Sequence, residues 1–521
     1  MTVRLADPTP EAYRFPLLIR HLLTSALDTR TAAEIVGTDG RRHGYPEFAR
    51  RVARLARILA DRGVRAGDTV AVMDWDSHRY LEAYFAIPMM GAVLQTVNVR
   101  LSPEQVAYTV SQTCPSAILV HADFETLLAE IRASLPHDLT IIGLQDDRPH
   151  AQIADYETLL AAADTPFIFT DFDEDALATT FHTTGTTGLP KAVAFSHRQL
   201  VLHTLSVMGA FAAQPNDQAF RRDDVYMPIT PMFHVHAWGL PYVATLLGVK
   251  QVYPGRYVAE RLVALREAEG VTFSHGVPTI VQMLVEAIGD RVRTTPWKMV
   301  VGGSAFPTSL RRAAAGCGIV AFAGYGMSET GPVLTLARAA NDGDRDRLSH
   351  AGQAIPLVQI ALDDGEVVAR APWLTQGYVD DVDASADLWR GGWLHTQDVA
   401  TIEDDGDLVI RDRLKDVIKT GGEWVSSAQM EDLTMRHPRV IAASYIGIAD
   451  ERWGERPVAF LVGRGTTPDL SSIREHLAVF VERGTISRYA LPDRIIPIAE
   501  LPRTSVGKID KKALRMLAAS V

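Results

Sequence analysis

The sequence predicts an α/β fold with a large N-terminal part and a small C-terminal domain. Its 521 residues exceed what one hydrophobic core usually holds, so at least two domains are expected. Helical and strand-like patterns alternate through most of the length, which predicts parallel sheets covered by helices. The strand-rich residues 358–410, broken by Gly and Asp turns, end near 411–415. The remaining C-terminal segment has its own alternation and is long enough for a small domain.

The first elements of the chain show both the helical and the strand-like pattern of apolar residues. Apolar residues three or four positions apart predict a helix over Tyr45–Arg62, and Gly63 then ends it. Short apolar runs predict buried strands over Thr69–Met73 and Ala117–His121, with a second helix over His78–Met90 between them. This order of strand and helix is the one that a parallel sheet requires.

Composition excludes several classes of function. A formal net charge of −11 argues against a nucleic-acid binder that works by releasing counterions. The cysteines, Cys114 and Cys317, stand outside any CxxC pair, so a disulfide framework and a zinc site are both disfavoured. The sequence has no apolar run of the roughly 20 residues that span a membrane, and its first residues lack a signal pattern. A cytoplasmic location is therefore expected.

The strongest chemical signal is the segment Thr183–Lys191, with the sequence TTGTTGLPK. A loop dense in glycine and threonine can direct backbone N–H groups and hydroxyls toward phosphate oxygens, and Lys191 adds a positive charge. The segment differs from the Walker pattern, because neither serine nor threonine follows the lysine. It predicts a phosphate-binding loop, with a polar surface loop as the alternative.

This loop resembles the signature loop of the adenylate-forming superfamily, which contains acyl-CoA synthetases, peptide-synthetase adenylation domains and luciferases. The other family motifs follow in order along nearly the whole chain. The stretch Met232–Tyr242 is similar to that of bacterial medium- and long-chain fatty-acyl-CoA synthetases. The resemblance implies an N-terminal domain over residues 1–412, with ATP and acyl sites and a distorted β-barrel. It also implies a small, mobile α+β C-terminal domain over residues 413–521, which carries the catalytic lysine.

On the nucleotide side, the resemblance implies that Tyr325 lies near the adenine, Asp398 binds the ribose hydroxyls and Thr330 binds the α-phosphate. Gln397 departs from the family's Thr-Gly-Asp motif. Because glutamine tolerates a positive φ poorly, the backbone angle of this loop is left open. The full set of expected nucleotide contacts is Thr183, Thr184, Gly185, Thr186, Thr187, Gly188, Lys191, Gly303, Ser304, Gly324, Tyr325, Gly326, Met327, Ser328, Thr330, Asp398 and Arg413.

Catalysis is assigned by the same resemblance to Lys508, Glu329 and Thr186. Lys508 matches the family's catalytic lysine, which would bridge the acid's carboxylate and the α-phosphate. Glu329 and Thr186 would hold Mg²⁺, a hard cation that binds oxygen ligands. The expected chemistry is therefore electrostatic stabilisation of a reaction between two anions.

The acyl group is expected to lie near His234, Val235, Trp238, Gly302 and Gly326. In some similar synthetases a tryptophan gates the acyl tunnel, and Trp238 matches its position. The bulk of Trp238 and its apolar neighbours favour a medium-chain fatty acid or a compact hydrophobic or aromatic acid. Chain length is not encoded in any motif.

The boundary between the domains is expected near residues 411–415. Lys415 falls at the family's hinge position, while Gly421, Gly422 and Trp424 lie on the loop that faces the thiol substrate. The resemblance implies that the C-terminal domain swings about the hinge after adenylation. Lys508 would then withdraw, and coenzyme A would reach the acyl carbon.

The predicted function is an acid–thiol ligase that uses ATP, Mg²⁺ and coenzyme A. Transfer of the acyl group to a carrier protein or an amine is an alternative, as is a non-catalytic nucleotide-binding homologue. A homodimer is expected by analogy, whereas nucleic acid and a membrane span are not expected. The contributions of Ala192, His182 and His236 are left open.

Overall fold

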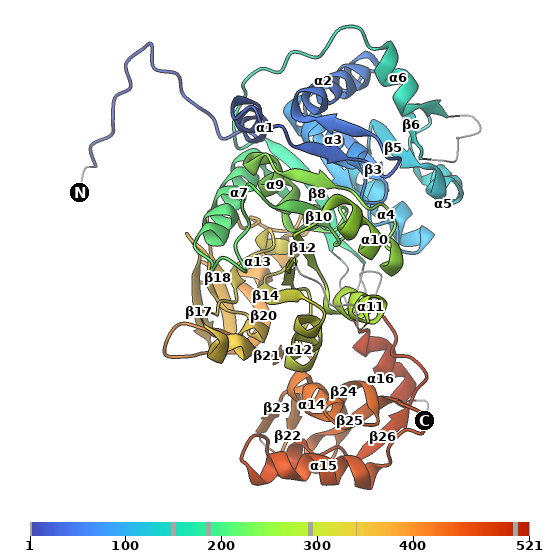
Figure 1. Ribbon diagram of the computed structural model, residues 1–521, viewed down its shortest axis with the longest axis vertical. Coiled ribbons are helices and arrows are strands. Elements are labelled where there is room, and N and C mark those ends of the chain that lie inside the picture. The colour runs from blue at the N-terminus through green and yellow to red at the C-terminus, as the bar shows by residue number, and fades with distance from the viewer. Residues whose placement is uncertain are drawn as a thin grey trace.

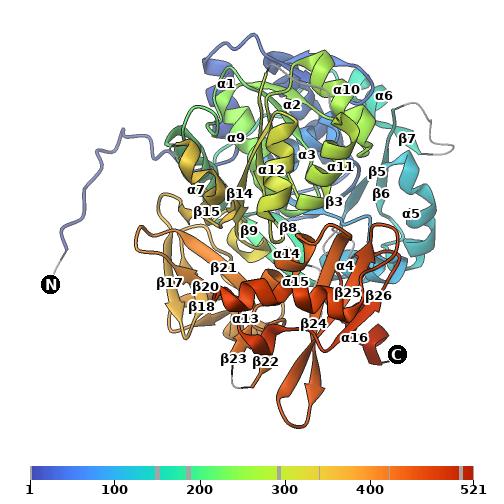
Figure 2. The ribbon, with the colours of Figure 1, turned by 60° about the horizontal axis from the view of Figure 1, so that its bottom comes forward.

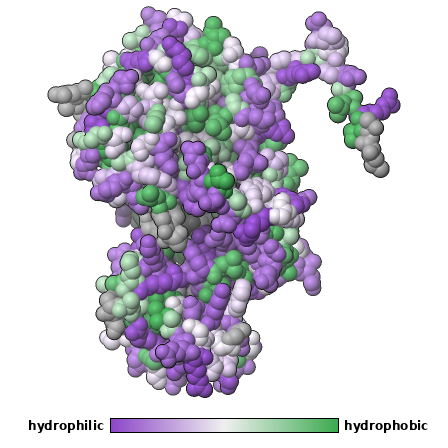
Figure 3. Space-filling model, turned by 180° about the vertical axis from the view of Figure 1, so that it is seen from behind, coloured by the Kyte–Doolittle hydropathy of each residue, from purple (hydrophilic) through white to green (hydrophobic). Residues whose placement is uncertain are grey.

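The computed structural model describes residues 3–146, 153–183, 189–289, 295–339, 341–421, 423–503 and 509–519. Figure 1 shows the N-terminal sheets, coloured from blue to yellow, above the C-terminal elements in orange and red. An extended N-terminal segment stands away from the body in the same view. Seen from behind, the molecule narrows where the C-terminal part joins the rest (Figure 3). The expected α/β fold with a smaller C-terminal part is confirmed.

The first sheet has the strand order β7–β6–β5–β3–β4–β8–β9. Its strands pair in parallel from β7 to β8, and β9 lies antiparallel to β8. The strands are β3 (Thr69–Met73), β4 (Val93–Thr96), β5 (Ala117–His121), β6 (Thr140–Leu144), β7 (Ala154–Asp155), β8 (Leu177–Thr183) and β9 (Lys191–Ser196). The helices before and between them are α2 (Tyr45–Asp61), α3 (His78–Met89), α4 (Pro103–Thr113), η1 (Ala122–Phe124), α5 (Glu125–Ile131), η2 (Arg132–Ser134) and α6 (Tyr156–Ala162).

The elements predicted from periodicity are confirmed. Strands β3 and β5 have the expected bounds. Helices α2 and α3 each end one residue before the expected position. Ser77 caps α3, because its hydroxyl accepts a hydrogen bond from the Tyr80 backbone N–H.

The second sheet has the order β16–β15–β14–β13–β12–β10–β11–β1–β2. Its central strands pair in parallel, while β2, β15 and β16 are antiparallel to their neighbours. The strands are β1 (Glu34–Val36), β2 (Arg42–Gly44), β10 (Val225–Pro228), β11 (Lys250–Val252), β12 (Phe273–Gly276), β13 (Trp297–Val301), β14 (Ile319–Tyr325), β15 (Thr335–Leu336) and β16 (Gln353–Ala354). The helices are α1 (Arg20–Asp28), α7 (His197–Ala212), α8 (Val235–Trp238), α9 (Leu240–Leu247), α10 (Ala259–Glu269), α11 (Pro278–Ile288), α12 (Thr308–Gly316), η3 (Ser328–Thr330) and η4 (Asp342–Ser349).

The third sheet stands where the barrel is expected. It is antiparallel, and its pairing follows an open path from β17 through β18 and β20 to β19, with β21 beside β20. Among the described strands this path does not close into a ring. The elements are β17 (Gln359–Asp363), β18 (Glu366–Arg370), α13 (Val382–Leu388), β19 (Trp389–Arg390), β20 (Trp393–Ile402) and β21 (Leu408–Arg413).

The C-terminal part has its own sheet and its own hydrophobic clusters, which begin at Ile418. Figure 2 brings this sheet forward, with α14 and α15 over β24 and β25. The elements are β22 (Ile418–Thr420), β23 (Glu423–Val425), α14 (Ser427–Met435), β24 (Val440–Asp450), β25 (Gly454–Gly463), α15 (Leu470–Glu482), η5 (Arg488–Ala490), β26 (Arg494–Pro497) and α16 (Lys511–Ala519). In the described part of the chain, no helix is long and apolar enough to cross a bilayer.

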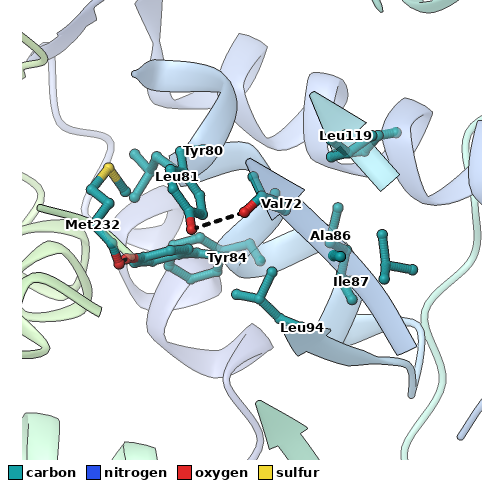
Figure 4. Close-up of a cluster of buried hydrophobic side chains, with 14 of the residues drawn as sticks. Val72, Tyr80, Leu81, Tyr84, Ala86, Ile87, Leu94, Leu119 and Met232 are labelled. Atoms are coloured by element: carbon teal, nitrogen blue, oxygen red, sulfur yellow. Dashed lines mark hydrogen bonds between the residues drawn. The ribbon is translucent and has the colours of Figure 1, made fainter. Parts of the chain in front are cut away.

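Two large hydrophobic clusters fill the N-terminal part, and the segment 232–242 contributes to both. Met232 belongs to the cluster on the first sheet and Trp238 to that on the second. Figure 4 shows Met232 beside Tyr84 of α3, whose hydroxyl donates a hydrogen bond to the Met232 carbonyl. The expected acyl-binding segment therefore lies where the two clusters meet.

Candidate functional site

Three of the expected nucleotide contacts converge at the end of β14. Tyr325, the last residue of β14, donates its hydroxyl hydrogen to Asp398 Oδ2 over 2.9 Å. Arg413 Nε lies 3.1 Å from Asp398 Oδ1, and the two residues are direct partners across β20 and β21. Burial and the nearby Asp398 charge raise the pKa of Tyr325 well above its ordinary value, so the phenol stays protonated. The arrangement brings an aromatic ring from the second sheet together with a carboxylate and a guanidinium from the third.

Gln397 adopts the backbone conformation that the family's glycine would favour. Its φ is +60°, although a glutamine side chain disfavours this region. The Gln397 N–H donates to Glu366 Oε1 over 2.8 Å, and its carbonyl accepts from the Leu414 N–H over 2.9 Å. These hydrogen bonds hold the turn that precedes Asp398.

A second group of polar side chains surrounds Glu329. This residue lies in η3, is 6% exposed, and accepts a 2.7 Å hydrogen bond from the Tyr378 hydroxyl. Lys191 Nζ lies 4.8 Å from the centre of the Tyr378 ring and 3.8 Å from Asp381 Oδ2. The structure thus joins two residues predicted from separate motifs through Tyr378. Sequence reasoning missed Tyr378 because a single Gly-Tyr pair in a loop carries no chemical pattern.

Close backbone approach explains the glycines of the site. A Cβ at Gly326 would lie 1.3 Å from the Pro332 carbonyl oxygen, and one at Gly302 would lie 2.6 Å from the Gly324 carbonyl oxygen. Neither distance is sterically possible, so no other residue fits without backbone movement. At Gly302 the same Cβ would meet Trp238 Cη2 at 3.3 Å. The tryptophan ring therefore lies directly against the expected acyl-binding glycine.

The remaining nucleotide residues of the second sheet surround the same turn. Gly303 and Ser304 are exposed just after β13, while Met327 and Ser328 are half-buried in the turn that holds Glu329. Thr330 is fully buried, and its hydroxyl exchanges hydrogen bonds with the backbone of Met327 and Pro332. In this structure the Thr330 hydroxyl is thus satisfied within its own turn.

The phosphate-loop prediction falls partly outside the described residues. Thr183 ends β8 and lies directly opposite Lys191, the first residue of β9. The antiparallel strands β8 and β9 therefore hold the two ends of the predicted loop, Thr183 and Lys191, next to each other. The predicted site residues that lie outside the described ranges are Thr184, Gly185, Thr186, Thr187, Gly188, Gly422 and Lys508.

The expected acyl segment has an unusual backbone. Residues 235–239 all have positive φ, between 47° and 73°, and four of them are not glycine. Such a left-handed turn is unfavourable for L-residues with a Cβ. The second residue of the turn is fixed, because His236 Nε2 lies 2.6 Å from Thr179 Oγ1 in β8. The turn places His234 at one end and the buried Trp238 at the other.

Polar contacts surround the expected hinge. The Ser427 hydroxyl donates to Asp412 over 2.6 Å, and the Arg515 guanidinium contacts both the Lys415 carbonyl oxygen and Asp416. Arg413 ends the last strand of the third sheet, and the C-terminal sheet begins at Ile418. Lys415 therefore lies in the short connection between two sheets.

The expected thiol-side loop is a hairpin of the C-terminal sheet. Gly421 follows β22 with a φ of +62°, and a Cβ there would approach the Tyr489 ring to 3.2 Å. Trp424 is 51% exposed on β23, with Lys419 Nζ 5.4 Å from its ring centre. An exposed aromatic side chain beside a cation suits a planar or anionic ligand.

The fold and the site define a two-part α/β protein whose polar groups gather at a candidate nucleotide-binding site. Family models match most of the chain: the AMP-binding enzyme family over residues 24–379 and the AMP-binding enzyme C-terminal domain over residues 429–508. The chain belongs to the AMP-binding enzyme family. This confirms the resemblance to the adenylate-forming superfamily.

Characterised relatives match over nearly the full length. The long-chain-fatty-acid–CoA ligase of Thermus thermophilus is 39% identical, over 90% of this chain and 89% of the relative. The 3-methylmercaptopropionyl-CoA ligase of Ruegeria lacuscaerulensis is 33% identical, over 96% and 97%. The medium-chain-fatty-acid–CoA ligase of Ectopseudomonas oleovorans is also 33% identical, over 96% of each chain.

Solved structures support the fold. An anthranilate CoA ligase in complex with anthranoyl-AMP superposes with a TM-score of 0.84 at 22% identity, covering 97% of this chain and 99% of the other. An amide bond synthetase from Marinactinospora thermotolerans gives a TM-score of 0.81 at 23% identity, over 96% and 99%. Because proteins with different acceptors share this fold, the fold alone does not select the acyl acceptor.

Proposed function

We propose that the chain is an AMP-forming acyl-CoA ligase. It joins a carboxylic acid to ATP, releasing pyrophosphate, and then transfers the acyl group from acyl-AMP to coenzyme A, releasing AMP. The observation that carries this proposal is the convergence of Tyr325, Asp398 and Arg413. They lie close to the turn that contains Glu329, and Glu329 is in turn hydrogen-bonded by Tyr378. The extended similarity to CoA ligases supports the same reaction.

The first half-reaction must bring a carboxylate to a triphosphate, so electrostatic repulsion dominates its barrier. Lys191, beside the phosphate loop, offsets charge on the outer phosphates. Lys508 is proposed to bridge the carboxylate and the α-phosphate. The nearly buried Glu329 carboxylate has the hard-oxygen chemistry that Mg²⁺ prefers, with Thr186 as the proposed second ligand. When bound, the ion would neutralise phosphate charge.

The second half-reaction requires a thiol to reach the same carbonyl carbon. We infer that the C-terminal domain, proposed to comprise residues 413–521, rotates about Lys415. The rotation would withdraw Lys508 and bring the Gly421–Gly422 loop and Trp424 toward the thiol. The short connection between β21 and β22 supports this hinge, because few backbone angles need to change there.

A medium-chain or compact hydrophobic acid is the proposed substrate. Trp238 is 6% exposed and lies against Gly302, with its ring 5.2 Å from that of His275. Bulk at this position limits the space for a long unbranched chain. Two of the relatives act, by name, on medium-chain fatty acids and on 3-methylmercaptopropionate, which are acids of intermediate and short length. The relative that is 39% identical acts, by name, on long-chain fatty acids. Homodimer formation and a cytoplasmic location remain predictions from the sequence.

The proposal is tested by incubating the purified protein with ATP, Mg²⁺ and coenzyme A across a panel of acids. Pyrophosphate release and thioester formation are measured separately. Lys508→Ala is expected to lower acyl-AMP formation by at least about 100-fold, while thiolysis of supplied acyl-AMP continues. Lys512→Ala, which alters an exposed lysine of the next helix, serves as the control. Pyrophosphate release with an amine or carrier-protein product, and no thioester, would reject the choice of acceptor.

A further inference from the structure

Tyr378 contacts two site residues through different parts of its side chain. Its hydroxyl donates to Glu329 Oε1 over 2.7 Å, and the Lys191 ammonium lies 4.8 Å from its ring centre. The ring also packs against both large hydrophobic clusters, which restricts its movement. A single half-buried phenol therefore touches an anion with its polar end and a cation with its aromatic face.

The backbone around Tyr378 is anchored to the same two motifs. The Val379 N–H donates to the Ala192 carbonyl in β9, and the Thr375 N–H donates to the Glu329 carbonyl. The Tyr378 N–H itself donates to Ser385 Oγ over 2.9 Å. Residues 375–379 thus connect the strand that carries Lys191 with the turn that carries Glu329.

We propose that Tyr378 is a positioning residue for the phosphate end of the site. Its hydroxyl orients the Glu329 carboxylate toward Mg²⁺, and its ring orients the Lys191 ammonium toward the phosphates. This inference rests on the proposed function and deepens it. Lysine and glutamate side chains lose rotational freedom when they bind a ligand. Restricting both side chains beforehand reduces the cost of assembling the charged site.

The tyrosine also keeps the two charges available. Opposite charges attract strongly in a poorly solvated site, and a direct Lys191–Glu329 pair would use both groups. Among the described residues, Lys191 instead forms its ion pair with Asp381. The neutral ring satisfies the ammonium through a cation–π contact without removing the carboxylate from the metal.

The test compares Tyr378→Phe, which removes the hydroxyl and keeps the ring, with Tyr378→Leu, which removes both. Tyr13→Phe deletes a surface tyrosine hydroxyl that is bonded to Asp171, and serves as the matched control. Binding of α,β-methylene-ATP is measured by titration calorimetry with and without Mg²⁺. The Mg²⁺ concentration that gives half-maximal pyrophosphate release is measured in parallel.

Tyr378→Phe is expected to raise the half-maximal Mg²⁺ concentration roughly tenfold, since it removes a hydrogen bond to a charged group. Excess Mg²⁺ should restore its activity, and metal-free binding of the analogue should match the wild type. Tyr378→Leu should also weaken metal-free binding, because Lys191 loses its ring contact. An unchanged Mg²⁺ response in Tyr378→Phe, or equal losses with and without Mg²⁺, overturns the inference alone. A wild-type protein that binds no analogue overturns the proposed function as well.

Discussion

Thr179→Val tests how the left-handed turn 235–239 is held. The Thr179 hydroxyl donates its hydrogen to the Leu94 carbonyl over 2.9 Å, so it must accept from His236 Nε2–H. Burial lowers the pKa of His236 to about 3, so the ring is neutral at pH 7 and carries one proton. Valine has nearly the same shape as threonine but can neither donate nor accept. The substitution therefore removes two buried hydrogen bonds and little volume.

The magnitude follows from two opposing terms. A buried polar group left without a partner costs about 1–3 kcal/mol. Thr179→Val leaves two such groups, so it should cost about 2–6 kcal/mol if nothing moves. The four non-glycine residues of the turn, each strained by at least about 1 kcal/mol, store a comparable amount. Relaxation of the turn should offset part of the loss. We expect the free energy of unfolding to fall by about 2 kcal/mol, with Trp238 displaced from Gly302.

The assay combines urea unfolding, tryptophan emission and steady-state kinetics. The KM for the acid should rise about tenfold, which corresponds to about 1.4 kcal/mol, while the KM for ATP stays constant. The emission change should be absent in a Trp238→Phe background. Thr179→Ser retains the hydroxyl and should behave like the wild type. Wild-type acid kinetics and emission in Thr179→Val, or equal damage from Thr179→Ser, would refute the reasoning.

Three further predictions concern packing, buried charge and pH. Gly302→Ala places a Cβ 2.6 Å from the Gly324 carbonyl oxygen and should abolish acid-dependent pyrophosphate release, whereas Gly316→Ala, where a Cβ meets nothing within 4 Å, should leave turnover unchanged. Arg51→Met removes the guanidinium that lies 2.6 Å from the buried Glu82 carboxylate, and should lower the free energy of unfolding by about 3–5 kcal/mol in urea titrations. Arg57→Met, at an exposed ion pair, should change the free energy of unfolding by less than about 1 kcal/mol. Equal effects of the two substitutions would contradict the argument. Burial lowers the pKa of His203 and His275 to about 3 and of His197 to about 4. Their stabilising contribution is complete above pH 6.5, the pKa of the unfolded state, and is lost as the pH falls toward these folded-state values. His203→Gln should reduce the slope of unfolding free energy against pH between 6.5 and 4 by about 1.4 kcal/mol per unit, and an unchanged slope would show that His203 is not neutral in the folded state.

The contacts that each motif makes depend on long-range packing. Tyr378 meets Glu329 across 49 residues of chain, and Thr179 meets His236 across 57. Gln397 keeps its positive φ because Glu366, on the neighbouring strand, accepts its N–H. No local pattern encodes these partners, because they depend on strand order and on how the sheets pack.

Local sequence patterns are enough to predict the helices, the strands and the chemistry of each motif. Helix α2 and strand β3 follow from apolar spacing, and the motifs that resemble the family's predict Asp398 and Arg413 as nucleotide contacts. Local patterns encode such features because hydrophobic periodicity and turn preference act within a few residues. Which side chain holds a site residue in place depends instead on long-range packing, so Tyr378 could be found only in the folded molecule.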